Sequence, residues 1–176
     1  MKSLDNGIEL FTEGNWDEAI KEFNGCIMGN VKDCDAWRYK GAVCEIRKHL
    51  LYEKSLSSMA AYCFEMALLA DPNDAISWAY LSVHLNAEGD LSSSQQYLDK
   101  FYKAAGQNQT ELEAGRAVMD FAQSNYESAQ KHFQTVIDAD SQNSLAKGFL
   151  VAIENRLAEV EPVRAPRAKA QKTTPE

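Results

Sequence analysis

The chain has 176 residues, of which a quarter are charged, and its formal net charge is −8. This length is enough for one domain with a real hydrophobic core or for one short repeat array. Residues 161–176 carry a net charge of +2, which leaves −10 for residues 1–160. A body this acidic argues against sequence-independent binding to nucleic acids and to anionic membranes, and it favours a basic partner.

The N-terminal segment, MKSLDNGIELF, has no apolar run typical of a signal peptide, and no later run is long enough to cross a bilayer. We therefore expect a cytoplasmic protein without direct membrane insertion. The four cysteines, Cys26, Cys34, Cys44 and Cys63, form no CxxC pair and have no histidine at metal-ligand spacing. We expect them to be buried structural thiols.

A short pattern returns four times along the chain. GNWDEAIKEF (14–23) and SNYESAQKHF (124–133) both have a small residue, then Asn, then an aromatic residue, followed by Ala and Phe four apart. Related segments are SLSSMAAYCF (55–64) and GDLSSSQQYL (89–98), so the starts are spaced by 41, 34 and 35 residues. Residues four apart share one face of a helix, and a period of about 34 residues indicates repeated helix-turn-helix units.

The residues between these starts agree with such a unit. The first helix of such a unit has the pattern W-x2-L-G-x2-Y, and its spacing is followed by Trp37, Gly41 and Cys44 and by Trp78, Leu81, Ser82 and Leu85. The second helix has the pattern A-x3-F-x2-A followed by Pro, and it is matched by Ala60, Phe64, Ala67 and Pro72. Over roughly residues 3–143 the chain resembles a tetratricopeptide repeat protein. The resemblance implies an all-α fold, a right-handed superhelical array of about four helix pairs with a C-terminal capping helix, and protein binding on its concave face.

The repeat register divides the chain into a single repeat domain, residues 1–160, and a tail, residues 161–176. The expected helix pairs and the capping helix are residues 1–33, 34–74, 75–109, 110–143 and 144–160. Within a pair we expect the helices to touch at small residues, with Gly7 and Gly41 opposite Ala19 and Ala60. The tail is rich in Pro, Ala and Lys, and we expect it to be disordered.

The second repeat contains seven extra residues, within KHLLYEKSLSS (48–58). Seven residues make about two helical turns, so we expect each helix of this pair to be longer by one turn. Leu50, Leu51 and Tyr52 would lie at the projecting tip. They either cover one another there or form an exposed apolar surface for a partner.

Catalytic chemistry is not indicated by the sequence. No nucleophile motif, Gly-rich phosphate loop or metal cluster occurs, and His49, His84 and His132 fall in separate repeats at unrelated positions. We expect no enzymatic activity, no cofactor and no metal site. The clamp of Lys, Asn and Arg with which some tetratricopeptide domains hold acidic chaperone tails is also missing, because residues such as Leu4 and Tyr39 occupy its positions.

Function is therefore expected on the surface. The repeat register places nine first-helix residues on the concave face: Arg38, Tyr39, Ala42, Glu45, Ala79, Tyr80, Val83, Asn86 and Ala87. Tyr39 and Tyr80 hold equivalent positions and should line a shallow trough suited to a helix or an extended segment. The alternative is that both tyrosines only pack between repeats.

These expectations describe an adaptor or assembly factor that binds a protein or peptide partner in its groove. Two alternatives remain open. One is a customer-holding chaperone of a secretion or pilus system. The other is a structural scaffold that self-associates into a homo-oligomer through its ends or through the tip of the second repeat.

Overall fold

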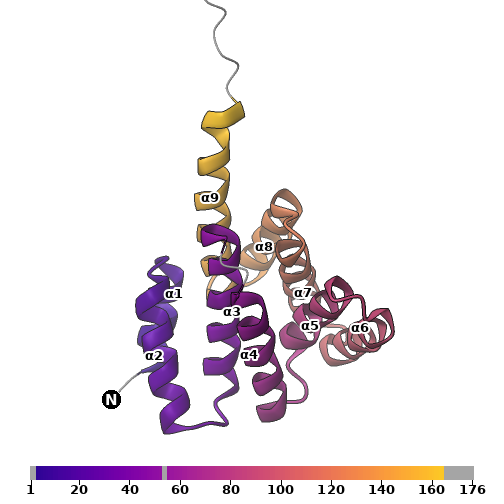
Figure 1. Ribbon diagram of the computed structural model, residues 1–176. Helices are drawn as coiled ribbons and strands as arrows, with labels where there is room; N and C mark the ends of the chain where they lie inside the picture. The colour runs from indigo at the N-terminus through magenta and orange to yellow at the C-terminus, as the bar shows by residue number, and fades with distance from the viewer. Residues whose placement is uncertain (1–2, 53–54, 165–176) are drawn as a thin grey trace, which may run out of the picture.

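The computed structural model describes residues 3–52 and 55–164 (Figure 1). Over these residues the chain forms nine α-helices and no strand, which confirms the predicted all-α class. The helices are α1 (Leu4–Thr12), α2 (Trp16–Gly29), α3 (Cys34–Leu51), α4 (Leu56–Ala70), α5 (Ala75–Ala87), α6 (Leu91–Ala105), α7 (Gln109–Ala122), α8 (Tyr126–Ala139) and α9 (Ser144–Arg164).

Consecutive helices pack in four pairs, α1 with α2, α3 with α4, α5 with α6 and α7 with α8 (Figure 1). Three of these pairs are connected by a turn with a positive φ, at Gly14 (80°), Gly89 (87°) and Ser124 (64°). Glycine adopts a positive φ without a Cβ clash, so it is the residue that the first two of these turns favour. Three of the four small residues that mark the repeats are thus points where the chain reverses.

The turns between pairs also share their chemistry. The side chains of Asp33, Asn108 and Asn143 each accept a hydrogen bond from the backbone N–H three residues later. These bonds satisfy one of the free N–H groups at the starts of α3, α7 and α9. The same capping chemistry therefore begins three helices that lie far apart in the sequence.

Glycines let the helices of a pair approach closely, but their neighbours are aromatic rings. A Cβ added to Gly7 would lie 2.6 Å from the ring of Phe23, and one added to Gly41 would lie 3.0 Å from the ring of Phe64. Both phenylalanines are almost fully buried. Ala19 and Ala60 are buried as well. The side chain that packs against each glycine, however, is the phenylalanine four residues after the alanine.

The insertion in the second repeat lengthens only one helix. α3 has 18 residues, against 13 in α5 and 14 in α7. α4 has 15 residues, as α6 does, so the expected extra turn in α4 is not found. Leu50 packs against the core, whereas Tyr52 is 69% exposed and takes a positive φ of 55°. The side chain of Leu51 lies outside the described part of the structure, as do residues 53–54.

Helix α9 does more than cover the last pair. It packs against α8, as expected of a capping helix, but also against α1 and α3 (Figure 1). Gly148 in α9 receives the Phe11 ring of α1, since a Cβ at Gly148 would lie 2.1 Å from that ring. Phe149 stacks on Phe133 with ring centroids 4.9 Å apart and meets Phe11 edge-on at 6.4 Å. The last helix therefore connects the two ends of the array.

The end of α9 also differs from the expected boundary. The helix continues to Arg164, so residues 161–164, expected in a disordered tail, are helical. The expected disorder of residues 165–176 falls outside the described residues.

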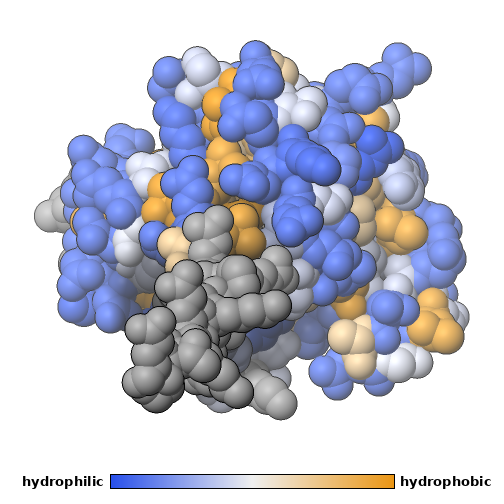
Figure 2. All heavy atoms as spheres, turned by 90° about the horizontal axis from the view of Figure 1, so that it is seen from above, coloured by the Kyte–Doolittle hydropathy of each residue, from blue (hydrophilic) through white to orange (hydrophobic). Residues whose placement is uncertain are grey.

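The surface seen from the α9 end is mostly hydrophilic, and its hydrophobic residues form small separate groups (Figure 2). Within the described residues, no helix combines the length and the apolar character needed to span a membrane.

Candidate functional site

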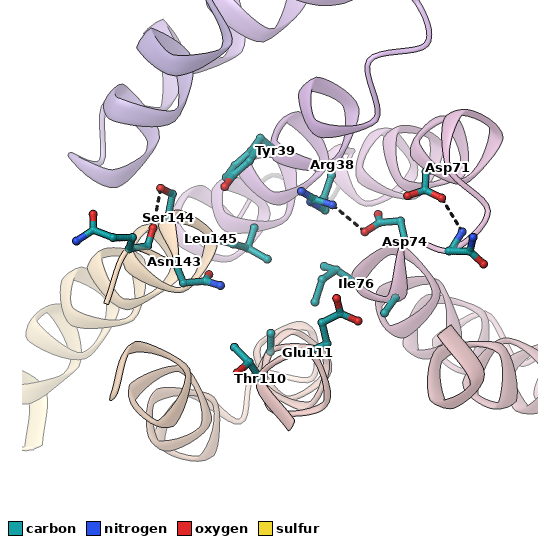
Figure 3. Close-up of a pocket in the computed structure, with 14 residues that line it drawn as sticks. Arg38, Tyr39, Asp71, Asp74, Ile76, Thr110, Glu111, Asn143, Ser144 and Leu145 are labelled. Carbon is teal, nitrogen blue, oxygen red and sulfur yellow. Dashed lines mark hydrogen bonds and ion pairs between the residues drawn. The ribbon is translucent and has the colours of Figure 1, made fainter. Parts of the chain in front are cut away.

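A cavity of about 400 Å³ opens where the N-terminal ends of α3, α5, α7 and α9 come together (Figure 3). This volume lies within the range of about 300–1,000 Å³ that is typical of small-molecule sites. Its walls come from these four helices and from the turns before α5 and α9. The lining residues are Arg38, Tyr39, Asp71, Asn73, Asp74, Ala75, Ile76, Thr110, Glu111, Ala114, Gln142, Asn143, Ser144 and Leu145.

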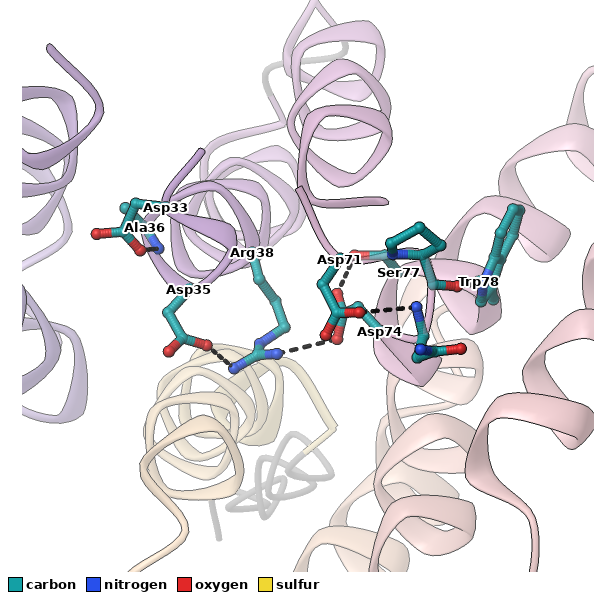
Figure 4. A network of polar contacts seen from close by, with 10 residues as sticks. Asp33, Asp35, Ala36, Arg38, Asp71, Asp74, Ser77 and Trp78 are labelled. Atoms are coloured by element: carbon teal, nitrogen blue, oxygen red, sulfur yellow. Dashed lines mark hydrogen bonds and ion pairs between the residues drawn. The ribbon is translucent and has the colours of Figure 1, made fainter. Parts of the chain in front are cut away.

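One wall of the cavity is held by an ion-pair network (Figure 4). Arg38 of α3 donates to the Oδ1 atom of Asp74 at 2.9 Å and also pairs with Asp35. Asp74, which is only 5% exposed, accepts a further hydrogen bond from Ser77. Burial alone would lower the pKa of Arg38, but the Asp74 and Asp35 carboxylates raise it above its ordinary value. The guanidinium is therefore a fixed positive group that ties α3 to the start of α5.

The cavity nevertheless has an excess of acidic groups. Asp71, Asp74 and Glu111 line it together with a single cation, Arg38. Asp74 is neutralised by Arg38, and Asp71 accepts a hydrogen bond from the backbone N–H of Asn73. Glu111 stands exposed in the first turn of α7, and among the described residues its carboxylate makes no hydrogen bond or ion pair. It is the acidic side chain left available to a guest.

The helix ends around the cavity partly offset this negative charge. The N-terminus of a helix carries a partial positive charge of about +0.5. Side-chain caps at Asp33, Asn108 and Asn143 already occupy N–H groups at three of the four helix starts. The guest that this site suits is therefore a polar group able to accept some hydrogen bonds and to donate others to a carboxylate, as a peptide with a cationic side chain does.

The structure divides the nine residues of the predicted groove into three sets. Arg38 and Tyr39 line the cavity. Asn86 and Ala87 are exposed at the opposite end of α5. The remaining five are buried: Ala42, Glu45, Ala79, Tyr80 and Val83.

The two tyrosines of the expected trough lie in the interior. Tyr39 is 8% exposed and its ring stacks on Phe23, with Phe11 at its edge. Tyr80 is 1% exposed and its ring stacks on Phe64 at 4.3 Å. Burial raises the pKa of both phenols. The middle of the predicted trough is thus filled by the protein's own side chains, which agrees with the alternative that these tyrosines pack between repeats.

A buried polar network, which was not predicted from the sequence, lies next to Tyr80. Glu45 is 1% exposed and accepts a hydrogen bond from the Tyr80 hydroxyl at 2.7 Å. Its other oxygen lies 2.8 Å from Nε2 of His49, whose Nδ1 lies 2.8 Å from the Tyr126 hydroxyl. Lys48 also pairs with Glu45. The network joins α3, α5 and α8 across the interior.

Glu45 remains a carboxylate in this network. Burial alone would raise its pKa, but hydrogen bonds and charge from His49 and Lys48 bring it below the ordinary value. The residues of this network do not line the cavity at the helix starts, and Glu45 and Tyr80 are almost fully buried, so we interpret the network as structural. Its sequence signal was present, since Glu45 and His49 are four apart and share a helix face.

Among the described residues, the four cysteines form no disulfide. Cys44 and Cys63 are buried and hydrogen-bonded to each other between α3 and α4, whereas Cys26 and Cys34 are half-buried. Among the described residues, no group of three or more His, Cys, Asp or Glu side chains is placed to hold a metal ion. The sequence matches no protein-family model and no curated protein.

Proposed function

We propose that this chain is a tetratricopeptide-like binding module that holds a short segment of a partner protein in the polar cavity, and that it acts as a non-catalytic adaptor or assembly factor. The observation that carries the proposal is the cavity itself. It lies where the N-terminal ends of four helices converge, and both the exposed Glu111 and the fixed guanidinium of Arg38 line it.

The positions of the helix starts support the repeat interpretation. The residues immediately before α3, α5, α7 and α9 are Asp33, Asp74, Asn108 and Asn143. Their spacings are 41, 34 and 35 residues, the same as those of the repeated segments in the sequence. Helices that begin at equivalent positions of successive repeats have their N-terminal turns along one edge of the array, where these turns surround a single site.

The charge of the lining indicates the partner's chemistry. Glu111 can pair with a Lys or Arg side chain, while the hydroxyl and amide groups of Thr110, Asn143 and Ser144 can bond to the backbone of an extended segment (Figure 3). The acidic body favours the approach of such a basic segment at low ionic strength. A customer-holding chaperone would need an open apolar groove, and the buried middle of α3 and α5 makes this alternative weaker.

The proposal is tested by selecting random displayed peptides on the immobilised full-length protein and measuring their affinity by calorimetry. Selected peptides should contain Lys or Arg, and Glu111→Lys should weaken their binding at least tenfold. Glu127→Lys is the matched control, because Glu127 is also an exposed glutamate in the first turn of a helix of 14 residues. Equal affinity for both variants, or selected peptides without basic residues, would contradict the proposed site.

A further inference from the structure

Two buried thiols meet between α3 and α4. Cys44 of α3 is 2% exposed and Cys63 of α4 is 0% exposed, and the two side chains are hydrogen-bonded to each other. The helices that carry them pack against each other as the second pair of the array (Figure 1). The two sulfur atoms are therefore in contact across the interface of this pair.

The helices approach each other closely at this point. Gly41 lies one turn before Cys44, and a Cβ added to it would be 3.0 Å from the ring of Phe64, the residue after Cys63. Ala60, one turn before Phe64, is completely buried in the same interface. Small residues let two helix backbones come near the Cα separation of about 4.4–6.8 Å that a disulfide spans.

The two thiols differ in acidity. The hydrogen bond from Cys63 has the largest influence on Cys44 and lowers its pKa. The positive charges of Lys40 and Arg47 act in the same direction, whereas burial and the Glu45 carboxylate oppose it. The same hydrogen bond and burial raise the pKa of Cys63. Cys44 is thus the thiol that loses its proton first, and the thiolate is the nucleophilic form of cysteine.

We propose that Cys44 and Cys63 form a redox-responsive dithiol, which hydrogen peroxide converts into a disulfide that ties α3 to α4. The Cys44 thiolate attacks one oxygen of the peroxide, so that an S–O bond forms, the O–O bond breaks and the leaving hydroxide takes up a proton as water. The Cys63 sulfur then gives up its proton and attacks the sulfenic acid. An S–S bond forms, the S–O bond breaks and a second water leaves. Two thiols lose two electrons, and one peroxide gains them.

Burial determines how this reaction begins. Because neither sulfur is exposed, the peroxide reaches the pair only when the interface of α3 and α4 opens locally. Hydrogen peroxide is little larger than water, so a small opening is sufficient. The disulfide closes a loop over residues 44–63, which contains the inserted segment of the second repeat. Neither cysteine lines the polar cavity, so the proposal is independent of peptide binding.

Cys34 is the competing partner for Cys63. It is half-buried and packs against the cluster of Trp37, Cys63 and Ala67. Burial raises the pKa of Cys34 to about 12, and the Asp74 carboxylate acts in the same direction. Cys34 therefore stays a thiol, and the pairing of Cys63 with Cys44 distinguishes the proposed dithiol from oxidation at the more accessible cysteines.

Peptide mapping of the full-length protein after treatment with hydrogen peroxide tests the pairing. We expect the main product to be a disulfide between Cys44 and Cys63, with the loss of two hydrogen atoms in the intact mass and full reversal by dithiothreitol. The double variant Cys26→Ser/Cys34→Ser is the control and should form the same disulfide at the wild-type rate. A disulfide that contains Cys26 or Cys34 as the main product, or a Cys44–Cys63 pair that stays reduced, overturns the proposal.

Two further measurements test the mechanism. In Cys63→Ser the sulfenic acid at Cys44 has no partner, so dimedone should label Cys44 in the peroxide-treated variant. In the wild type the disulfide should raise the melting temperature by about 5–10 °C, because it restricts the unfolded chain without distorting the folded pair. A lower melting temperature of the oxidised protein would mean that the helices must move apart to form the bond, and it would contradict a pair that is already in position.

Discussion

At Gly148 the missing side chain allows the Phe11 ring from the other end of the chain to lie against the α9 backbone. The Phe11 ring is completely buried and cannot turn away into solvent. Gly7, Gly41 and Gly115 show the same relation to Phe23, Phe64 and Phe101. A pairing of glycine and phenylalanine thus occurs within helix pairs, between two neighbouring pairs and between the ends of the array.

Gly148→Ala should lower the free energy of unfolding by about 1–3 kcal/mol, because the new methyl group overlaps a ring that has no room to move. Gly29→Ala is the control, since a Cβ at Gly29 would have no atom within 4 Å. In a helix, Ala is preferred over Gly by about 0.5–1 kcal/mol, so this variant should be neutral or slightly more stable. Denaturant unfolding measures both, and equal effects would contradict the contact at Gly148.

Glu45 is the residue at which stability should depend on acid. Its pKa in the folded protein lies below the ordinary value of 4.5. Its stabilising contribution is therefore complete above about pH 4.5 and is lost as the pH falls through the folded pKa, because the unfolded chain then binds the proton more readily. Glu45→Gln keeps an oxygen for the Tyr80 hydroxyl but has no proton to bind in this range.

We expect Glu45→Gln to cost about 1–3 kcal/mol at pH 7, through weaker hydrogen bonds to His49 and Lys48. The difference from wild type should shrink as the pH falls below about 4.5. Unfolding free energies measured from pH 7 to pH 3 provide the test. Two curves that stay parallel over the whole range would mean that Glu45 does not carry this stability.

Among the elements, α9 joins the two ends of the array. It packs against α1 and α3 as well as against the last pair, whereas a helix that only capped the last repeat would contact α7 and α8 alone. Phe149 is the side chain that joins these contacts, with Phe11, Phe121 and Phe133 around its ring. Loss of this ring should therefore destabilise the first helix as well as the last pair.

Phe149→Ala should destabilise the fold by about 3–5 kcal/mol, as expected for a fully buried aromatic residue. Amide hydrogen exchange should become faster in α1 and in α8 together. Phe101→Ala is the control, because Phe101 is equally buried but belongs to a cluster with Ala75, Ala79, Ala105 and Leu112. If α1 keeps its protection in Phe149→Ala, the contact between the ends of the chain is not stabilising.

The helices could be predicted from the sequence because their signals are local. Gly14 and Gly89 mark turns, and the repeat period orders the pairs. The extra turn of α3 was predicted for the same reason. The contact that this extra turn makes, between His49 and Tyr126, was not predicted, because it depends on how α3 and α8 lie relative to each other.

The candidate site was predicted only in part. The repeat register places Tyr39 and Tyr80 on the face of the first helices, whether or not another element covers that face. Phe11 and Phe149 are far apart in sequence, so no local pattern indicates that α9 returns to α1. Arg38 was found in advance, but Glu111 was not, because the polar residues of a helix's first turn carry no signal beyond capping.

On the scale of the whole molecule, the ends of the array meet and the middle of the first helices is buried. The hollow that remains lies at the starts of α3, α5, α7 and α9, and it combines acidic groups with helix N-termini (Figure 3). Binding at the edge of the array where these four helices begin needs no movement of the core. A partner segment would therefore occupy the cavity without separating α9 from α1.

The most direct test of this site is an amide chemical-shift map of the isotope-labelled protein, titrated with the tightest selected peptide. We expect the largest changes in the first turns of α3, α5, α7 and α9, including Glu111 and Ser144, with little change in the middle of α5. Largest changes around Ala42 and Val83, or on the outward face of α4, with the helix starts unaffected, would contradict binding in the polar cavity.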